Sequence, residues 1–88
     1  MSEIDKNRNA IDWTKLSNAQ GIVKAEYINA KEKHPWHFTS PHEGYAVLLE
    51  EVDELWAEVK KNSFDKESAR KEAVQIGAMV IRFITELC

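Results

Sequence analysis

The sequence predicts a small all-α protein, and three observations carry that prediction. Its 88 residues include only three glycines and two prolines, while the helix-favouring residues Ala, Glu, Lys and Leu are plentiful. Apolar residues recur at three- and four-residue steps in three stretches. Short polar breaks separate these stretches. We therefore expect an antiparallel helical hairpin plus an N-terminal helix, completed into a four-helix-type bundle by oligomerisation.

Composition restricts the partners and the compartment. The net charge of -3 disfavours a nucleic-acid backbone, whose binding relies on clustered Lys and Arg. Cys88 is the single cysteine, so no disulfide can form within the chain, as is typical of a reducing cytoplasm. The polar first ten residues lack a signal-peptide core, and no apolar run has the length of a membrane span. We expect a cytoplasmic protein with a frayed segment 1–10 and one helical domain, 11–88, that binds neither nucleic acid nor membranes.

The first helix is expected to begin at Asp12 and to stop near His34. Asp12 can cap it, although Ser17 offers a second possible start, and Gly21 leaves open one helix or a broken pair. The stop follows from Pro35, because the residue before a proline avoids helical geometry. The apolar positions of this first helix are Trp13, Leu16, Ala19, Val23, Tyr27 and Ala30. Trp13 and Tyr27 are assigned to the core.

The second helix has a clear start signal. Ser40 is the expected N-cap, Pro41 takes the first helical position, and Glu43 can return a hydrogen bond to the Ser40 amide. We expect it to end near residues 61–62, with two cations in its last turn. One apolar arc, assigned to the core and including Trp56, is formed by Tyr45, Leu48, Leu49, Val52, Leu55, Trp56 and Val59.

The third helix, Lys66 to Leu87 with Asp65 as N-cap, has two apolar faces. One face consists of Ala73, Ile76, Val80, Phe83, Ile84 and Leu87. The other consists of Val74, Ala78 and Ile81. A monomer of three helices is expected to cover only one face of each, so the second face predicts a homodimer or homotetramer.

Paired acids are the chemically informative feature. Glu51 and Glu54 are three residues apart on one helix, and Glu72 and Gln75 repeat that spacing on the next. Packing the two helices together would bring both pairs to one seam, which is how helical bundles build metal sites. Oxygen ligands of this kind favour Mg²⁺, with Mn²⁺ also suitable. The alternative is that these acids are the solvated edge of an amphipathic helix.

These motifs support a family resemblance. The run Glu50-Glu51-Val52-Asp53-Glu54-Leu55 resembles the first acidic motif of the MazG-like, all-α nucleoside triphosphate pyrophosphohydrolases. Glu72-Ala73-Val74-Gln75 would be the second motif, and the resemblance covers about half of the chain, residues 43–87. The wider run from His42 to Glu51 is similar to small MazG-like proteins of phages and their bacterial hosts.

The resemblance implies a function and a set of site residues. The family cleaves nucleoside triphosphates to the monophosphate and pyrophosphate, which here implies Mg²⁺ held by Glu51, Glu54, Glu72 and Gln75. Glu51 would also take the proton of the attacking water. One departure matters, because Gln75 stands where the family has Asp and brings no charge. The competing interpretation is a non-catalytic oligomerisation or partner-binding module with a degraded metal site.

Three further residues are candidates for substrate binding. Lys31 and Arg82 could contact phosphates, the alternative being solvated cations. Trp36 could stack on the base, although Trp36 and Phe38 could instead cover the end of the core. Zinc is disfavoured because no cysteine lies near the three histidines, His34, His37 and His42.

Overall fold

The computed structural model describes residues 10–88, so the predicted frayed segment lies almost wholly outside the described part. The chain there forms helices α2 (Trp13–Lys33), α3 (Pro41–Val59) and α4 (Lys66–Leu87), and residues 10–88 contain no strand. The all-α prediction is confirmed at this level. No helix in the described part is long and apolar enough to cross a membrane.

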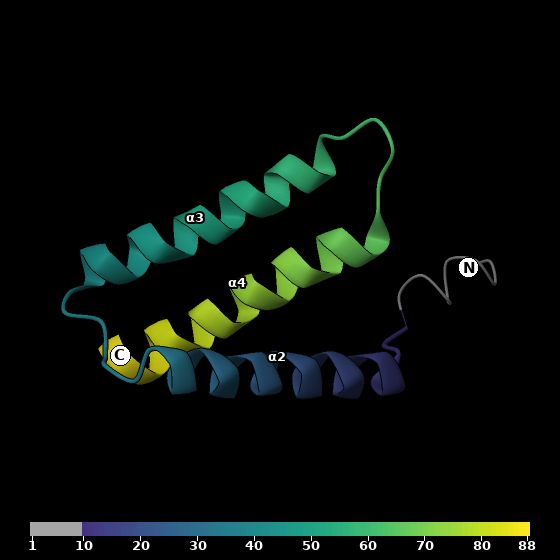
Figure 1. The fold of residues 1–88 in the computed structure, drawn as a ribbon. Coiled ribbons are helices and arrows are strands. Elements are labelled where there is room, and N and C mark those ends of the chain that lie inside the picture. The colour runs from purple at the N-terminus through teal and green to yellow at the C-terminus, as the bar shows by residue number, and fades with distance from the viewer. Residues whose placement is uncertain (1–9) are drawn as a thin grey trace.

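Helix α4 is the centre of the molecule. It packs against both α2 and α3, whereas no Cα atom of α2 lies within 8 Å of one in α3. Figure 1 shows α4 between the other two, antiparallel to α3 and running in the same direction as α2. The expectation that one chain covers only one face of each helix is therefore wrong for α4, because α2 takes the side that α3 leaves free.

The ends of α2 and α4 lie where the sequence predicts them. The carboxylate of Asp12 accepts a hydrogen bond from the backbone N–H of Lys15 at 2.9 Å, and α2 continues through Gly21 as one helix. At α4, the Asp65 carboxylate accepts the N–H of Glu67 at 3.0 Å. These caps satisfy backbone donors that would otherwise have no partner at a helix start.

The ends of α3 differ in detail from the prediction. The Ser40 hydroxyl accepts the Glu43 N–H at 3.1 Å, as expected. The Glu43 carboxylate, however, accepts from the N–H and hydroxyl of Thr39, at 3.0 and 3.1 Å, rather than from Ser40. Helix α3 ends at Val59, so Lys60 and Lys61 follow its last turn instead of occupying it.

The core is built from small residues. Ala30, Ala78 and Met79 are buried together, and Tyr27, Val47 and Leu48 pack against them. Phe38 is also buried, which confirms that it covers the end of the core. Among the described residues no large side chain is fully buried. The single chain therefore contains only a thin apolar centre.

Only some of the side chains in the apolar arc predicted for α3 are covered in the structure. Leu48 and Leu55 are half-buried. The members that stay exposed are Tyr45 at 61%, Leu49 at 41%, Val52 at 41%, Trp56 at 59% and Val59 at 48%. The assignment of Trp56 to the core is therefore wrong within one chain, as is that of Trp13, which is 70% exposed. On α3 these side chains stay exposed because α4 is the one helix that packs against it in residues 10–88, and α4 covers only part of this wide arc.

Candidate metal centre

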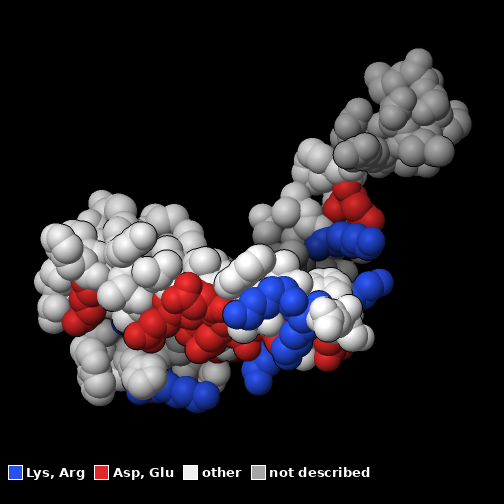
Figure 2. All heavy atoms as spheres, turned by 90° about the horizontal axis from the view of Figure 1, so that it is seen from above, with Lys and Arg blue, Asp and Glu red and all other residues white. Residues whose placement is uncertain are grey.

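Three carboxylates from two helices meet at the α3–α4 seam. Glu51 and Glu54 lie one turn apart in the middle of α3, and Glu72 lies in the first half of the antiparallel α4. One carboxylate oxygen of each lies within 4.8 Å of the others. Figure 2 shows acidic side chains gathered near the middle of the molecule on the face seen from above. The three glutamates therefore meet at the seam that their spacing predicts.

Burial and mutual repulsion raise the pKa values of two members of this cluster, Glu51 and Glu72. Partial burial raises the pKa of Glu51 to about 6, helped by the charge and hydrogen bonding of Glu54 and by the charge of Glu72. Burial, followed by Glu54, also raises the pKa of Glu72, against a smaller opposing effect of Lys71. Carboxylates whose pKa values rise in this way lack sufficient positive charge nearby. A bound cation would supply it.

The donor set is suited to a hard divalent cation. Carboxylate oxygens are ligands that Mg²⁺ and Mn²⁺ accept, and no sulfur or imidazole takes part in the cluster. Gln75 is half-buried on α4, one turn beyond Glu72, and its assignment as a neutral ligand stays a prediction. Glu50 and Asp53 are exposed and lie outside the cluster. The residues present therefore fit one hydrated Mg²⁺.

A second acidic site, formed by Glu86, was not predicted from the sequence. Its side chain is 2% exposed and accepts from the backbone N–H of Phe38 at 2.7 Å. It is paired with Arg82 Nε at 3.0 Å and with Lys31 Nζ at 3.1 Å. Burial alone would raise the pKa of Glu86, but hydrogen bonds from Arg82, Phe38 and Lys31, with the Arg82 charge, lower it to about 2.

Arg82 and Lys31 therefore have structural partners inside the chain. Arg82 is 6% exposed, its guanidinium lies 4.1 Å from the centre of the Phe38 ring, and it donates to the Trp36 carbonyl at 3.3 Å. Lys31 donates to the Pro35 carbonyl at 3.1 Å. Together these contacts fasten the segment 34–39 to α4. The Arg82–Glu86 spacing of four residues was the available sequence signal, since such pairs meet on a helix face.

The proposed substrate residues lie away from the carboxylate cluster. Arg82 follows Glu72 by ten residues on α4, which is about 15 Å along the helix axis. The Trp36 indole is 70% exposed and meets the His34 ring edge-on, with 6.4 Å between ring centres. The assignment of Lys31, Trp36 and Arg82 to the substrate stays a prediction.

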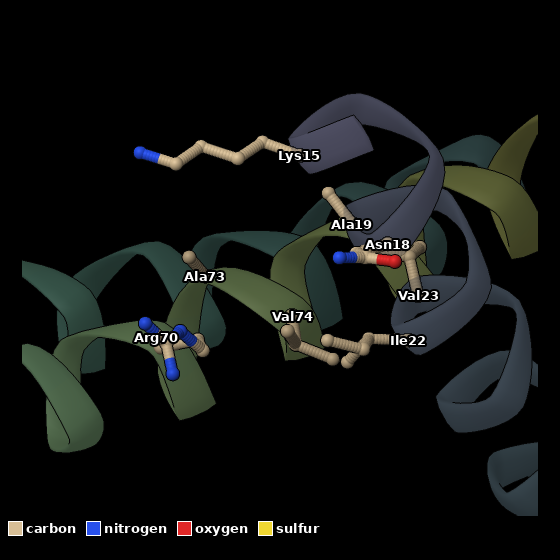
Figure 3. Close-up of a pocket in the computed structure, with 8 residues that line it drawn as sticks. All are labelled: Lys15, Asn18, Ala19, Ile22, Val23, Arg70, Ala73 and Val74. Atoms are coloured by element: carbon tan, nitrogen blue, oxygen red, sulfur yellow. The ribbon is translucent and has the colours of Figure 1, made fainter. Parts of the chain in front are cut away.

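A hollow of about 590 Å³ lies between α2 and α4. Its walls are mostly apolar, with two cations and an amide among them (Figure 3), and consist of Lys15, Asn18, Ala19, Ile22, Val23, Arg70, Ala73 and Val74. Arg70 is also paired with Glu67 at 2.9 Å. The sequence did not predict this hollow, because it depends on how far apart the two helices lie.

Comparison with known proteins identifies no relative. No family model, no curated protein and no solved structure matches the chain. The functional proposal therefore depends on the acidic motifs and on the geometry of the carboxylate cluster.

Proposed function

We propose that the protein is a MazG-like, Mg²⁺-dependent nucleotide pyrophosphohydrolase that cleaves (d)NTP to (d)NMP and pyrophosphate as a homo-oligomer. One observation carries the proposal: carboxylate oxygens of Glu51, Glu54 and Glu72 lie within 4.8 Å of one another. Like charges held this close are costly unless a cation neutralises them. A site for Mg²⁺ is the arrangement that relieves this cost and also attracts a triphosphate.

Glu51 is the residue that we assign to proton transfer. A carboxylate that the metal does not fully occupy is ionised at neutral pH and can accept a proton from the attacking water. Bound Mg²⁺ would neutralise phosphate charge, orient the triphosphate and lower the pKa of Glu51. Water then attacks the α-phosphorus, its proton goes to Glu51, and the bond from that phosphorus to the α,β-bridging oxygen breaks. Pyrophosphate leaves with that oxygen.

Glu54, Glu72 and Gln75 are assigned to holding the metal. Three carboxylates are sufficient for one hydrated Mg²⁺, with the Gln75 amide as a neutral fourth ligand. Gln75 cannot act as a base, which is why we place proton transfer on Glu51. A cytoplasmic location agrees with a nucleotide substrate and with the single exposed cysteine.

The second candidate function is a non-catalytic helical module that binds a partner or assembles with itself. Two observations favour it. Gln75 lowers the charge of the metal site by one relative to the family pattern, and five large apolar side chains of α3 are at least 41% exposed. In this alternative the acids are a solvated helix edge, and metal has no special affinity for them.

Metal titration followed by a turnover assay separates the two functions. Calorimetric titration with Mg²⁺ is expected to show a site in the wild type that is lost in Glu51→Gln. Pyrophosphate release from a panel of ribo- and deoxynucleoside triphosphates should then require Mg²⁺ and also disappear in Glu51→Gln. The matched control is Glu50→Gln, which removes an equal charge from the exposed neighbouring position outside the cluster.

The possible outcomes separate these interpretations. Binding and turnover that survive in Glu50→Gln but not in Glu51→Gln support the hydrolase. Neither binding nor turnover at millimolar Mg²⁺ supports the module. Equal losses in the two variants would show that overall negative charge, rather than the cluster, attracts the metal.

A further inference from the structure

The hollow between α2 and α4 narrows toward one end. Both helices run in the same direction, and Figure 1 shows their N-terminal ends farther apart than their C-terminal ends. The helices touch at Val23 and Gly77, where a Cβ atom added to Gly77 would lie 2.9 Å from Val23 Cγ1. The residues that line the hollow belong to the segments 15–23 and 70–74, on the N-terminal side of this contact. The hollow is therefore wedge-shaped, closed at Val23 and open toward the helix N-termini.

Apolar side chains line the closed end of the hollow. Ile22 and Val23 of α2 lie beside Val74 of α4, and Ala19 and Ala73 continue the two walls outward. Ile22 is 48% exposed, so water contacts apolar surface there. A volume of about 590 Å³ lies in the range of sites that take small molecules. An apolar ligand body would displace this water favourably.

The open end of the hollow is cationic. Lys15 and Arg70 line it, one from each helix, and in Figure 3 their charged groups lie to one side of the apolar side chains. None of the residues that line the hollow is acidic. Arg70 is paired with Glu67 through Nη1 at 2.9 Å, but a guanidinium carries five N–H donors, so others remain for a ligand. This end of the hollow therefore suits an anionic group.

The volume of the hollow favours a small molecule over a helix of another chain. A helix about 10 Å across with a rise of 1.5 Å per residue occupies roughly 120 Å³ per residue, so the hollow would take only about one and a half turns. The contact of Val23 with Gly77 also closes one end, so that a longer helix cannot lie along the hollow.

We propose that this hollow binds an amphipathic anion, a small molecule with an apolar body and one anionic head group. The body packs against Ile22, Val23 and Val74, and the head lies between Lys15 and Arg70. Lys15 precedes Val23 by eight residues, or about 12 Å along the axis of α2, a distance that an extended eight-carbon carboxylate can span. The site goes beyond the proposed hydrolysis and does not depend on it, because the carboxylate cluster lies on the α3 side of α4.

Binding of octanoate tests the site, with octan-1-ol and octylammonium as compounds of equal chain length. NMR spectra of the ¹⁵N-labelled protein are recorded without metal or nucleotide, so the result is independent of catalysis. Octanoate is expected to shift the amide signals of Ala19, Val23 and Val74 more than those of α3. So small a ligand should have a Kd on the order of a millimolar. Octan-1-ol should bind more weakly, and octylammonium more weakly still, because the two cations repel it.

Charge variants test the head group. The double variant Lys15→Gln/Arg70→Gln should weaken octanoate binding by about three- to tenfold, as expected for two partly exposed charge contacts, and leave octan-1-ol binding unchanged. The matched control is Lys24→Gln/Lys33→Gln, which removes the same charge from two exposed positions of α2 outside the hollow. Equal binding of octanoate and octan-1-ol, or an unchanged Kd in the first double variant, overturns the proposal.

A filling variant tests the apolar body. Ala73→Leu should abolish the octanoate shifts, because the longer side chain occupies the hollow. Ala57→Leu is the control, since Ala57 is exposed on α3, and circular dichroism checks that both variants stay helical. Octanoate shifts that persist in Ala73→Leu overturn the proposal. Hollow signals that move when the protein alone is concentrated, or octanoate binding only after removal of residues 1–9, also overturn it, because a second copy or that segment would then be the occupant.

Discussion

Helix α4 carries two carboxylates whose surroundings shift their pKa values in opposite directions. Glu86, near its C-terminal end, is held by Arg82, Lys31 and the Phe38 amide, and its pKa falls to about 2. Glu72, one half-helix earlier, lies against Glu54, and its pKa is raised. The two sites share a helix and a residue type. They differ in whether the chain itself supplies positive charge.

This difference separates a carboxylate with a structural role from carboxylates that are candidates for binding a cation. A carboxylate neutralised by its own chain has little affinity left for an external cation, because its acceptor positions are occupied. Carboxylates that repel one another retain that capacity, and their charge costs stability until a ligand arrives. The Glu86 site thus stabilises the fold, whereas Glu51, Glu54 and Glu72 keep acceptor positions that a cation could occupy. The predictions below test this division, beginning with the largest effect.

Removal of Glu86 should have the largest effect on stability. Glu86→Ala leaves Arg82 buried without its partner, and loss of one member of a buried pair costs about 3–5 kcal/mol. Urea unfolding followed by circular dichroism measures the change in free energy of unfolding. The control is Glu67→Ala, which breaks an exposed pair with Arg70 and should cost less than about 1 kcal/mol. Similar costs for the two variants would show that the buried pair adds nothing special.

Overpacking at Gly44 should destabilise the same end of the molecule by less. A Cβ atom at residue 44 would lie 2.7 Å from Leu87 Cδ1 and 2.9 Å from Phe83 Cδ2. Gly44→Ala should therefore lower the free energy of unfolding by about 1–3 kcal/mol. Gly21→Ala is the control, because nothing lies within 4 Å of its added atom and alanine favours helix by up to about 1 kcal/mol. A stabilised Gly44→Ala would mean that the helices separate there easily.

The carboxylate cluster should give the smallest effect, with a pH dependence opposite in sign to that of Glu86. The folded-state pKa of Glu51, about 6, exceeds its ordinary value of 4.5, so the folded protein binds this proton more tightly than the unfolded chain. Its stabilising contribution is present below pH 4.5 and is lost as the pH rises through about 6. Because Glu51 is only half-buried, we expect about 1 kcal/mol.

Thermal unfolding in a chelator between pH 4.5 and 7 measures this loss. This loss of stability should be absent in Glu51→Gln and retained in Glu50→Gln. It should become smaller when Mg²⁺ replaces the chelator. The Glu86 contribution behaves in the other direction, since its lowered pKa gives stability above pH 4.5 that is lost as the pH falls through about 2. If the pH dependence of unfolding is unchanged in Glu51→Gln, the loss of stability comes from other acidic residues.

Local sequence rules predict where the helices begin and end, but they predict the contacts between helices less well. Asp12, Ser40 and Asp65 cap the three helices as predicted, because capping depends on a few adjacent residues. Glu51 and Glu54 also lie close together as predicted, since helix geometry places residues three apart on one face. Trp56 was misassigned because periodicity identifies an apolar arc without showing how much of it a neighbour covers.

Long-range contacts explain what the sequence could not reveal. Lys31 and Glu86 are 55 residues apart, and nothing local indicates that they pair. The hollow between α2 and α4 likewise depends on the spacing of two helices that no loop connects directly. The pKa of Glu51 follows from the approach of α4 as well as from its own helix.

The position of α4 also has a consequence for how the protein acquires its structure. As a ribosome extends the chain, α2 and α3 are synthesised first, yet they have no backbone contact with each other. Each lacks its packing partner until α4 is made, and most of the stability of a helix in a protein comes from tertiary packing. We expect cooperative folding to begin only once α4 has left the exit tunnel. Until then, the nascent segments are candidates for capture by chaperones.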